Sequence, residues 1–419
     1  MGLSKSKEKV LVSTFNNYNR INGCSHRIYP GFCSSTIYIF YFLIDMTLKN
    51  KLTNFLLIAI SIALPLFITD IILKVLKFPF SNSGNLLIGG GYLQTNPRTK
   101  VKSYSEGKII RHSAVYGKEV IYDYEFITDQ NGFRVTYNCN KNNNDSDLIA
   151  IAGDSFTEGQ GVSNISWAST LQKVICERNY QSVNLSFPGI GVIDMKNSLK
   201  FAKDELKATK AVVSIITSDI YRPYLLLENN KKCSMFLKPS NIFSECGQNP
   251  ATWWHIPKTL KKNELINFVS KKYKYGLIPT SKIVLEDFIK QSKRTIKTYL
   301  PSSILKKIGT NNFKELILDS SNALNQIAFD FNVENIILII LPDKNDRNLV
   351  IKNTERKRQN DDLKMFLNQI NPKITIVDVR SCPLNKTHFY KLDGHPNFEG
   401  QKLLGECVIN NQKIKEFIQ

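Results

Sequence analysis

Five short, continuous apolar runs in the C-terminal part of the chain limit the folds that this sequence can adopt. The runs lie at 148–152, 183–186, 211–217, 335–341 and 374–379. They are rich in Val, Ile and Leu and do not alternate with polar residues, which is typical of strands buried on both faces. Segments of helical length separate or follow them, at about 164–178, 193–207, 313–331, 356–369 and 399–417. This alternation predicts an α/β fold in which helices cover both faces of a parallel sheet.

One gap between predicted strands is much longer than a crossover needs. It forms an insertion at 222–312, and between residues 258 and 307 it holds 13 basic residues against three acidic ones. We expect either a solvated, basic helical insertion or a lid that docks on an anionic polymer or a membrane face.

An uncharged run occupies residues 52–69, with Lys49 and Lys51 before it. At helical rise it nearly spans a bilayer core, and Pro65 would kink such a helix without forbidding it. The run predicts an uncleaved, single-pass signal anchor at 51–76, with a buried core helix or a cleaved signal peptide as alternatives. Basic residues flank both ends, so the charge pattern does not decide the orientation.

Around this run the chain divides into further regions. Residues 1–50 form a polar N-terminal segment, and Met46 resembles an ordinary start for a signal anchor, so the first 45 residues are expected to be an upstream extension of the reading frame. The first six residues match a myristoylation pattern only formally. Residues 77–146 are a juxtamembrane region with short strands, and 147–419 form the α/β domain.

Charge and cysteine content narrow the function classes. The net charge of +20 would suit nucleic acid, anionic lipid or acidic polysaccharide, but no nucleic-acid-binding motif is present, so nucleic acid is not expected as a partner. Eight cysteines form no CxxC pair, and the sequence predicts no metal site and no cofactor. Only Cys233 and Cys246 flank a loop closely enough to invite a local disulfide, so the redox compartment stays open.

Residues suited to nucleophilic catalysis follow the predicted strands. Ser155 comes directly after the first strand and Gly153, where open α/β folds place their ligands. A serine hydroxyl needs a neighbouring base, and His395 follows the last strand with Asp393 two residues before it. His388 is an alternative base.

An ester-cleaving site also needs donors for the oxyanion that forms on attack. Gly189 follows the second strand and Ser218 follows the third, so both are expected at the same sheet edge as Ser155. The amides of Ser155 and Gly189 and the hydroxyl of Ser218 are the candidate oxyanion donors.

These residues resemble the blocks of the SGNH (GDSL-like) hydrolase family. The segment 153–159 is similar to the nucleophile block, 184–191 to the second block, and 393–397 to the block that carries the acid and the base. Residues 128–134 resemble a stretch that precedes the nucleophile in membrane-anchored bacterial members. The resemblance implies a three-layer α/β/α fold with a five-stranded, flavodoxin-like parallel sheet.

Two positions depart from the family pattern. Ser218 stands where the third block normally carries an asparagine whose amide is an oxyanion donor, and losing one such donor costs about 10²–10³ in turnover. Asp393 stands two residues before His395 rather than three, which resembles the alginate O-acetyltransferase-like branch and favours acyl transfer.

The sequence therefore predicts a membrane-anchored serine esterase or O-acyltransferase, acting on acetyl or other acyl esters of a cell-envelope glycan. Its catalytic domain is expected on the extracytoplasmic side. One alternative is a catalytically degenerate protein that binds glycan through the basic insertion. Another is a lipid esterase at the membrane surface, which would prefer long acyl chains.

Overall fold

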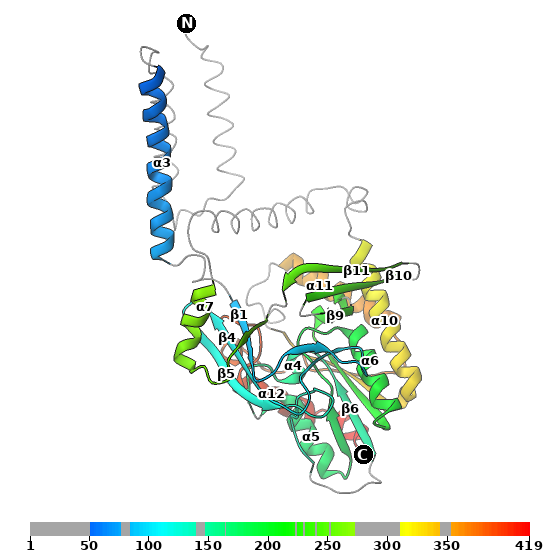
Figure 1. Ribbon diagram of the computed structural model, residues 1–419. Coiled ribbons are helices and arrows are strands. Elements are labelled where there is room, and N and C mark those ends of the chain that lie inside the picture. Colours follow the sequence, from blue (N-terminus) through cyan, green and yellow to red (C-terminus); the bar gives the residue numbers. More distant parts are fainter. Residues whose placement is uncertain are drawn as a thin grey trace. The chain divides into compact units, whose positions relative to one another are not determined.

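The computed structural model describes residues 51–76, 84–139, 147–163, 165–222, 224–228, 231–238, 241–250, 253–272, 311–343 and 353–419. The chain forms two compact units, Met1–Lys74 and Val75–Gln419 (Figure 1). The polar segment at 1–50 lies outside the described residues.

A five-stranded parallel sheet forms the centre of the second unit. Its strands are β6 (Leu148–Ala152), β7 (Gln181–Asn184), β8 (Ala208–Ile215), β13 (Ile336–Ile340) and β14 (Thr375–Asp378). The spatial order is β14-β13-β8-β6-β7, with every neighbouring pair parallel. Numbered along the chain this is the order 2-1-3-4-5 read from the other edge, which is the flavodoxin-like topology. The predicted fold class is confirmed.

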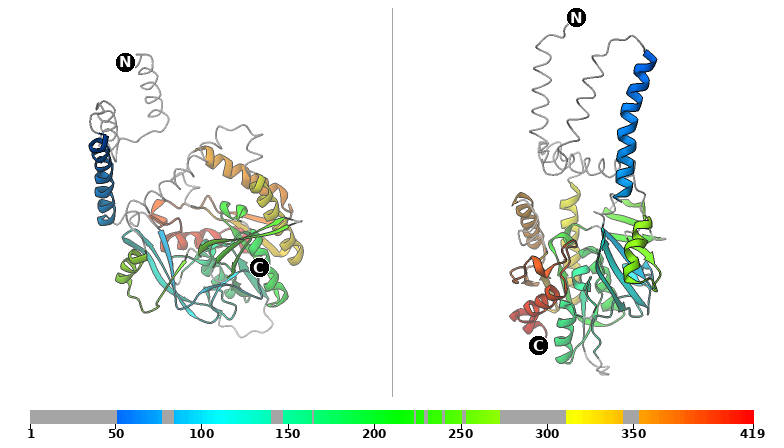
Figure 2. Two further views of the ribbon diagram at one scale, coloured as in Figure 1. Left: turned by 45° about the horizontal axis from the view of Figure 1, so that its top comes forward. Right: turned by 90° about the vertical axis from the view of Figure 1, so that its left-hand side faces the viewer.

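Helices cover both faces of this sheet, as can be followed in Figure 1 and Figure 2. The helices are α5 (Trp167–Glu177), α6 (Val192–Asp204), α10 (Asn311–Phe331), α11 (Asn353–Gln369), α12 (Phe398–Ile409) and α13 (Gln412–Phe417). Alternate residues of β6 enter different cores. Ala150 packs with α6, α10 and α11, whereas Ile151 packs with α5, α12 and α13.

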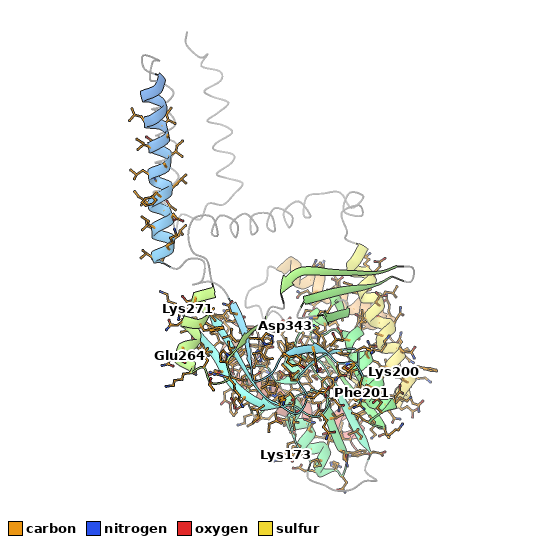
Figure 3. All side chains as sticks on the ribbon, viewed as in Figure 1. Lys173, Lys200, Phe201, Glu264, Lys271 and Asp343 are labelled. Carbon is orange, nitrogen blue, oxygen red and sulfur yellow. A yellow bond between two sulfur atoms is a disulfide. The ribbon has the colours of Figure 1, made fainter. Side chains whose placement is uncertain are left out.

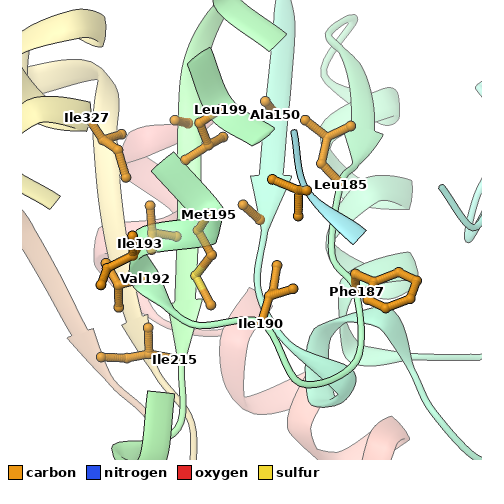
Figure 4. Close-up of a cluster of buried hydrophobic side chains, with 14 of the residues drawn as sticks. Ala150, Leu185, Phe187, Ile190, Val192, Ile193, Met195, Leu199, Ile215 and Ile327 are labelled. Atoms are coloured by element: carbon orange, nitrogen blue, oxygen red, sulfur yellow. The ribbon is translucent and has the colours of Figure 1, made fainter. Parts of the chain in front are cut away.

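Burial of one face holds each covering helix on the sheet. Leu199 and Met195 of α6 are fully buried against Ala150, and Ile327 of α10 joins the same cluster (Figure 4). On α6 the buried Phe201 follows the exposed Lys200 (Figure 3), so one helix presents an apolar and a charged face.

A second, mainly antiparallel sheet is built from the region before the α/β domain. Its strands β1 (Gly84–Gly89), β4 (Ile109–Tyr116) and β5 (Glu119–Ile127) pair in that order, and β12 (Trp253–Ile256) from the insertion adds to β1 in parallel. The strands β2 (Leu93–Thr95) and β3 (Lys102–Tyr104) form a separate hairpin. The region at 77–146 contains strands, as expected, but β4 and β5 are longer than the short strands predicted.

The insertion is not simply helical in its described part. It begins with three antiparallel strands, β9 (Tyr224–Glu228), β10 (Lys231–Lys238) and β11 (Asn241–Pro250), and only later forms α7 (Leu265–Lys272). The basic residues that suggested a helix begin at Lys258, whereas the earlier stretch alternates short apolar runs with two-residue turns, which favours hairpins. Residues 273–310, which carry much of the positive charge, lie outside the described residues.

Disulfides appear where the sequence analysis did not expect them. Cys139 is bonded to Cys176 of α5, and Cys382 is bonded to Cys407 of α12. The backbone register also places Cys233 opposite Cys246 on β10 and β11, the one pair that the sequence singled out. The two bonded pairs are separated by 37 and 25 residues, so they become neighbours only through the packing of helices and loops.

The first unit contains α3 (Lys51–Val75). Its segment Leu57–Val75 has a mean hydropathy of 2.1, and none of its window is buried. By length and composition this helix can cross a membrane.

Candidate active site

Ser155 lies at a sharp turn between β6 and the short helix α4 (Ser155–Glu158). A Cβ on Gly153 would collide with Thr157 and Ser214, so only glycine fits at the start of this turn. Asp154 caps α4 by accepting a hydrogen bond from the Phe156 amide at 2.9 Å. The cap holds the turn closed and presents Ser155 at the carboxyl edge of the sheet.

Ser155, His395 and Asp393 come together in one hydrogen-bonded series. His395 Nε2 lies 2.7 Å from Ser155 Oγ, and His395 Nδ1 is hydrogen-bonded to Asp393 Oδ1. The backbone amide of His395 also donates to Asp393 Oδ1, at 3.0 Å. With Asp393 on Nδ1, the imidazole has Nε2 available to accept the serine proton.

The surroundings of Asp393 keep its carboxylate charged. Burial raises the pKa of this carboxyl, but the hydrogen bonds from His395 and the charge of that ring outweigh burial, so the pKa lies below its ordinary value. The ionised carboxylate can therefore stabilise an imidazolium at neutral pH.

The loop after β7 and the start of α4 supply backbone donors. Gly189 has a φ of +75°, a left-handed conformation that glycine adopts without strain. Within the described residues, the backbone amides of Ser155 and Gly189 make no hydrogen bond to a protein acceptor. Both amides can therefore donate to a bound ligand, and their role as oxyanion donors stays a prediction.

Ser218 lies in the loop after β8 and is held by Arg222. The Arg222 guanidinium donates to Ser218 Oγ at 3.3 Å and forms ion pairs with Asp154 and Asp219, at 3.1 and 2.7 Å. It also donates to the Ile190 carbonyl at 2.8 Å. Because Ser218 Oγ accepts a hydrogen bond from Arg222, its own proton remains available to another acceptor.

Sequence reasoning missed Arg222, which ties together the three loops that carry the candidate donors. Arg222 stands four residues after Ser218 in the sequence, and this spacing could have indicated that the two side chains interact. It also missed Lys102, a buried residue of β3 whose Nζ lies 3.5 Å from the Gly189 carbonyl oxygen. Lys102 comes from the hairpin preceding the α/β domain, so no local pattern points to it.

The segment at 128–134 has a structural task beside the nucleophile. Asp129 Oδ1 accepts from the amides of Asn131 and Phe133 and closes a turn. The turn sends the buried Arg134 into the loop after α4, where its guanidinium donates to the carbonyls of residues 158, 159, 162 and 163. Arg134 therefore fixes the chain that follows Ser155.

His388 and His112 have hydrogen-bond partners other than the nucleophile. His388 Nδ1 accepts a hydrogen bond from the Asn385 amide and so belongs to a 3₁₀ turn. His112 is fully buried on β4, with Nδ1 2.9 Å from the hydroxyl of Tyr124. Burial lowers the pKa of His112 to about 3, so its ring is neutral at physiological pH.

Several solved structures of ester-cleaving enzymes are similar to this chain. A lipase/acylhydrolase from Enterococcus faecalis matches 65% of this chain and 95% of its own, at 12% identity and a TM-score of 0.33. A psychrotrophic esterase from a Pseudoalteromonas species matches 64% and 97%, at 10% identity and a TM-score of 0.34. A GDSL-like lipase from Bacteroides thetaiotaomicron matches 64% and 88%, at 10% identity and a TM-score of 0.29.

No family model and no curated protein matches the chain. None of the structural matches above concerns the alginate O-acetyltransferase-like branch. Identities of 10 to 12% assign no chemistry to this chain. The chemistry proposed for the site therefore follows from the geometry of its own residues.

Proposed function

We propose that the protein is a membrane-anchored serine esterase or O-acyltransferase that acts on acyl esters, acetyl esters above all, of a cell-envelope glycan. The observation that carries the proposal is the 2.7 Å approach of His395 Nε2 to Ser155 Oγ, with Asp393 on the other ring nitrogen. A buried serine so paired with an oriented imidazole is the arrangement that activates a hydroxyl for acyl transfer.

In the first half-reaction Ser155 Oγ attacks the ester carbonyl while its proton passes to His395 Nε2. The tetrahedral oxyanion accepts hydrogen bonds from the amides of Ser155 and Gly189 and from the Ser218 hydroxyl. When the intermediate collapses, His395 gives its proton to the departing alkoxide and the acyl group remains on Ser155.

In the second half-reaction His395 removes a proton from the acceptor hydroxyl. That hydroxyl attacks the acyl-serine, and the proton then returns to Ser155 Oγ. Water as acceptor completes an esterase cycle, and a sugar hydroxyl completes a transferase cycle, so the same residues serve both reactions.

The cellular placement of the proposed enzyme is supported by two features. The disulfides Cys139–Cys176 and Cys382–Cys407 in the described part of the chain are typical of proteins in oxidising compartments. The helix α3 is long and apolar enough to anchor the chain in a membrane. Together they favour an extracytoplasmic catalytic domain, the side on which envelope glycans lie.

A lipid esterase is a second candidate, favoured by one observation. Leu392 and Phe398 flank the Asp393–His395 segment in sequence and are each 46% exposed, so apolar side chains lie on the surface beside the proposed catalytic loop. Such side chains could contact a long acyl chain. A glycan-binding protein without catalysis is disfavoured because Ser155, His395 and Asp393 form one continuous series of hydrogen bonds.

The test uses the full-length protein in detergent, incubated with a fluorophosphonate probe and with p-nitrophenyl esters of increasing chain length. We expect probe labelling and acetate release in the parent, and a fall of at least about 10³-fold in Ser155→Ala. Ser381→Ala, which changes an exposed serine, is the matched control and is expected to behave as the parent.

The outcomes separate the candidates. Faster turnover of acetyl esters than of long-chain esters supports the hypothesis of an enzyme that acts on acyl esters of a glycan. Faster turnover of long-chain esters supports the hypothesis of a lipid esterase. A folded parent protein that neither reacts with the fluorophosphonate probe nor releases acetate would contradict both enzyme hypotheses.

A further inference from the structure

A series of hydrogen bonds joins the second sheet to the proposed catalytic acid. Tyr122 of β5 lies 271 residues before Asp393 in the chain, yet its hydroxyl is 3.2 Å from Asp393 Oδ2. Gln160, in the loop after α4, places its side-chain nitrogen 2.6 Å from the same hydroxyl. All three side chains are buried, with exposed fractions of 5% or less.

The charge on Asp393 decides the direction of these hydrogen bonds. An ionised carboxylate can only accept, so Tyr122 must donate its single proton to Asp393 Oδ2. The tyrosine oxygen is then an acceptor, and Gln160 must donate to it through its amide nitrogen. Burial and the charge of Asp393 raise the pKa of Tyr122 well above its ordinary value, so the phenol keeps this proton.

The two oxygens of Asp393 have separate partners. Oδ1 receives the ring nitrogen and the backbone amide of His395, and Oδ2 receives Tyr122. A carboxylate held at one oxygen can rotate about its last side-chain bond, whereas one held at both oxygens cannot. Tyr122 thus removes a motion that would break the contact between Asp393 and the imidazole.

We propose that Tyr122, oriented by Gln160, is a positioning residue of the catalytic site: it locks the Asp393 carboxylate in the plane that His395 requires. This inference rests on the proposed function and extends it. It makes the region at 77–146 a necessary part of the catalytic site, although the three triad residues all lie in the α/β domain.

The ring of Tyr122 is held independently of its hydroxyl. Its centroid lies 5.5 Å from that of His112 and 5.4 Å from that of Tyr390, with both pairs tilted or edge-on. Tyr122→Phe keeps these ring contacts and removes only the hydroxyl, so the variant is expected to fold.

The experiment measures the second-order rate of fluorophosphonate labelling in the full-length protein. We expect Tyr122→Phe to label about 10-fold more slowly than the parent, because a hydrogen bond to a charged group is lost. Tyr124→Phe is the matched control. Tyr124 lies two residues away on the same strand and is also buried, but its hydroxyl meets His112 and the Gly161 backbone rather than the triad. It is expected to label at the parent rate.

A second arm distinguishes positioning from general stabilisation. Tyr122→Phe is repeated in an Asp393→Ala background, where a residue that acts through the carboxylate has nothing left to hold, and there it should change the labelling rate less than twofold. Gln160→Met removes the hydrogen bond that Gln160 donates to the Tyr122 hydroxyl. We expect this variant to be labelled about 5-fold more slowly than the parent.

The results can overturn the inference in either arm. Parent-like labelling by both Tyr122→Phe and Gln160→Met would refute it while leaving the proposed function intact, since Ser155 would still be labelled. An equal loss with and without the Asp393 carboxylate would reduce Tyr122 to a structural residue. A folded parent that does not label at all overturns the proposed function, and the inference with it.

Discussion

Ser218 occupies the position where the resembled family normally carries asparagine, and Arg222 determines how its hydroxyl can act. By donating to Ser218 Oγ, Arg222 leaves the serine proton free to reach the oxyanion. We expect Ser218→Ala to lower kcat about 10- to 100-fold with little change in KM, since the bond forms in the transition state. Steady-state kinetics with p-nitrophenyl acetate check this.

Ser218→Asn provides the comparison, because an amide reaches further than a hydroxyl. We expect its kcat to equal or exceed that of the parent. If Ser218→Ala keeps the parent kcat, Ser218 is not a donor and the oxyanion depends on the Ser155 and Gly189 amides alone.

His112 gives the fold a specific sensitivity to acid. Its pKa is about 3 in the folded chain because of burial, against about 6.5 when unfolded, so the unfolded chain binds the proton more readily between these values. The stabilisation from the neutral ring is complete above about pH 6.5 and is lost as the pH falls, at about 1.4 kcal/mol per pH unit.

The prediction is that His112→Asn loses stability at pH 7 but shows a shallower decline in Tm between pH 6.5 and pH 4 than the parent. Thermal denaturation across this range measures it. His255→Asn is the control, because His255 is exposed and its replacement is expected to leave the slope unchanged. Parallel curves for the parent and His112→Asn would contradict the prediction.

At the scale of elements, Arg134 is the main tie between the second sheet and the loop after α4. Its buried guanidinium donates to four carbonyls, lies against the rings of Tyr124 and Phe126 and faces the buried Glu158. We expect Arg134→Met to lower the free energy of unfolding by about 3–5 kcal/mol, because it leaves a buried charge without its partner.

Arg98→Met is the matched control for this prediction. Arg98 pairs with Glu205 at the surface, where both side chains are more than 40% exposed, so its loss should cost about 0–1 kcal/mol. Chemical denaturation of both variants gives the comparison. If both variants lose the same free energy of unfolding, Arg134 does not connect the second sheet to the loop after α4 in the way proposed.

The disulfides constrain elements that follow one another closely in the chain. Cys382–Cys407 closes a stretch that contains Asp393 and His395, and Cys139–Cys176 fastens the segment after Arg134 to α5. By loop length each should contribute about 3–4 kcal/mol. We expect Cys382→Ser with Cys407→Ser to lower Tm, and a reducing agent to lower the Tm of the parent by more than that of a variant lacking these two described disulfides.

At the scale of the whole molecule, α3 belongs to one compact unit and the candidate active site to another. Every side chain in the apolar window of α3 lies outside the protein interior, as a lipid-facing helix requires. Placing Lys at both Ile62 and Leu66 should cost about 2.5–3.5 kcal/mol per charge on insertion. We expect this double variant to leave the membrane fraction after alkaline extraction, whereas the parent stays.

The control places a lysine at Leu318, an apolar residue of α10 that is 47% exposed on the catalytic unit. Leu318→Lys should remain in the membrane fraction. If alkaline extraction removes the parent protein from the membrane fraction as well as the double variant, α3 does not anchor the chain.

The sequence alone was sufficient for the central sheet. The strands β6, β8, β13 and β14 each overlap a local, continuous apolar run, and the observed β6 and β13 lie within one residue of the predicted bounds at each end. The run predicted at 183–186 became a strand at Gln181–Asn184, because the Asn184 side chain accepts from the Ser186 amide and turns the chain away.

The candidate site could be predicted to the same extent, and for a related reason. Ser155, Gly189, Ser218 and His395 each follow a strand, and parallel strands bring their carboxyl ends to one edge. Topology therefore predicted that the residues would lie at one edge, and the structure brings His395 Nε2 to 2.7 Å from Ser155 Oγ.

What the sequence by itself determined was thus encoded in short spans: the strands and helices of the central sheet, the apolar helix α3, and the motif residues at strand ends. Only the tertiary structure decided which distant side chains meet. Tyr122 reaches Asp393 across 271 positions, and Arg134 reaches the loop after α4 across 24 or more. Such contacts depend on how two sheets pack against each other, and no local periodicity records the partner of a buried polar group.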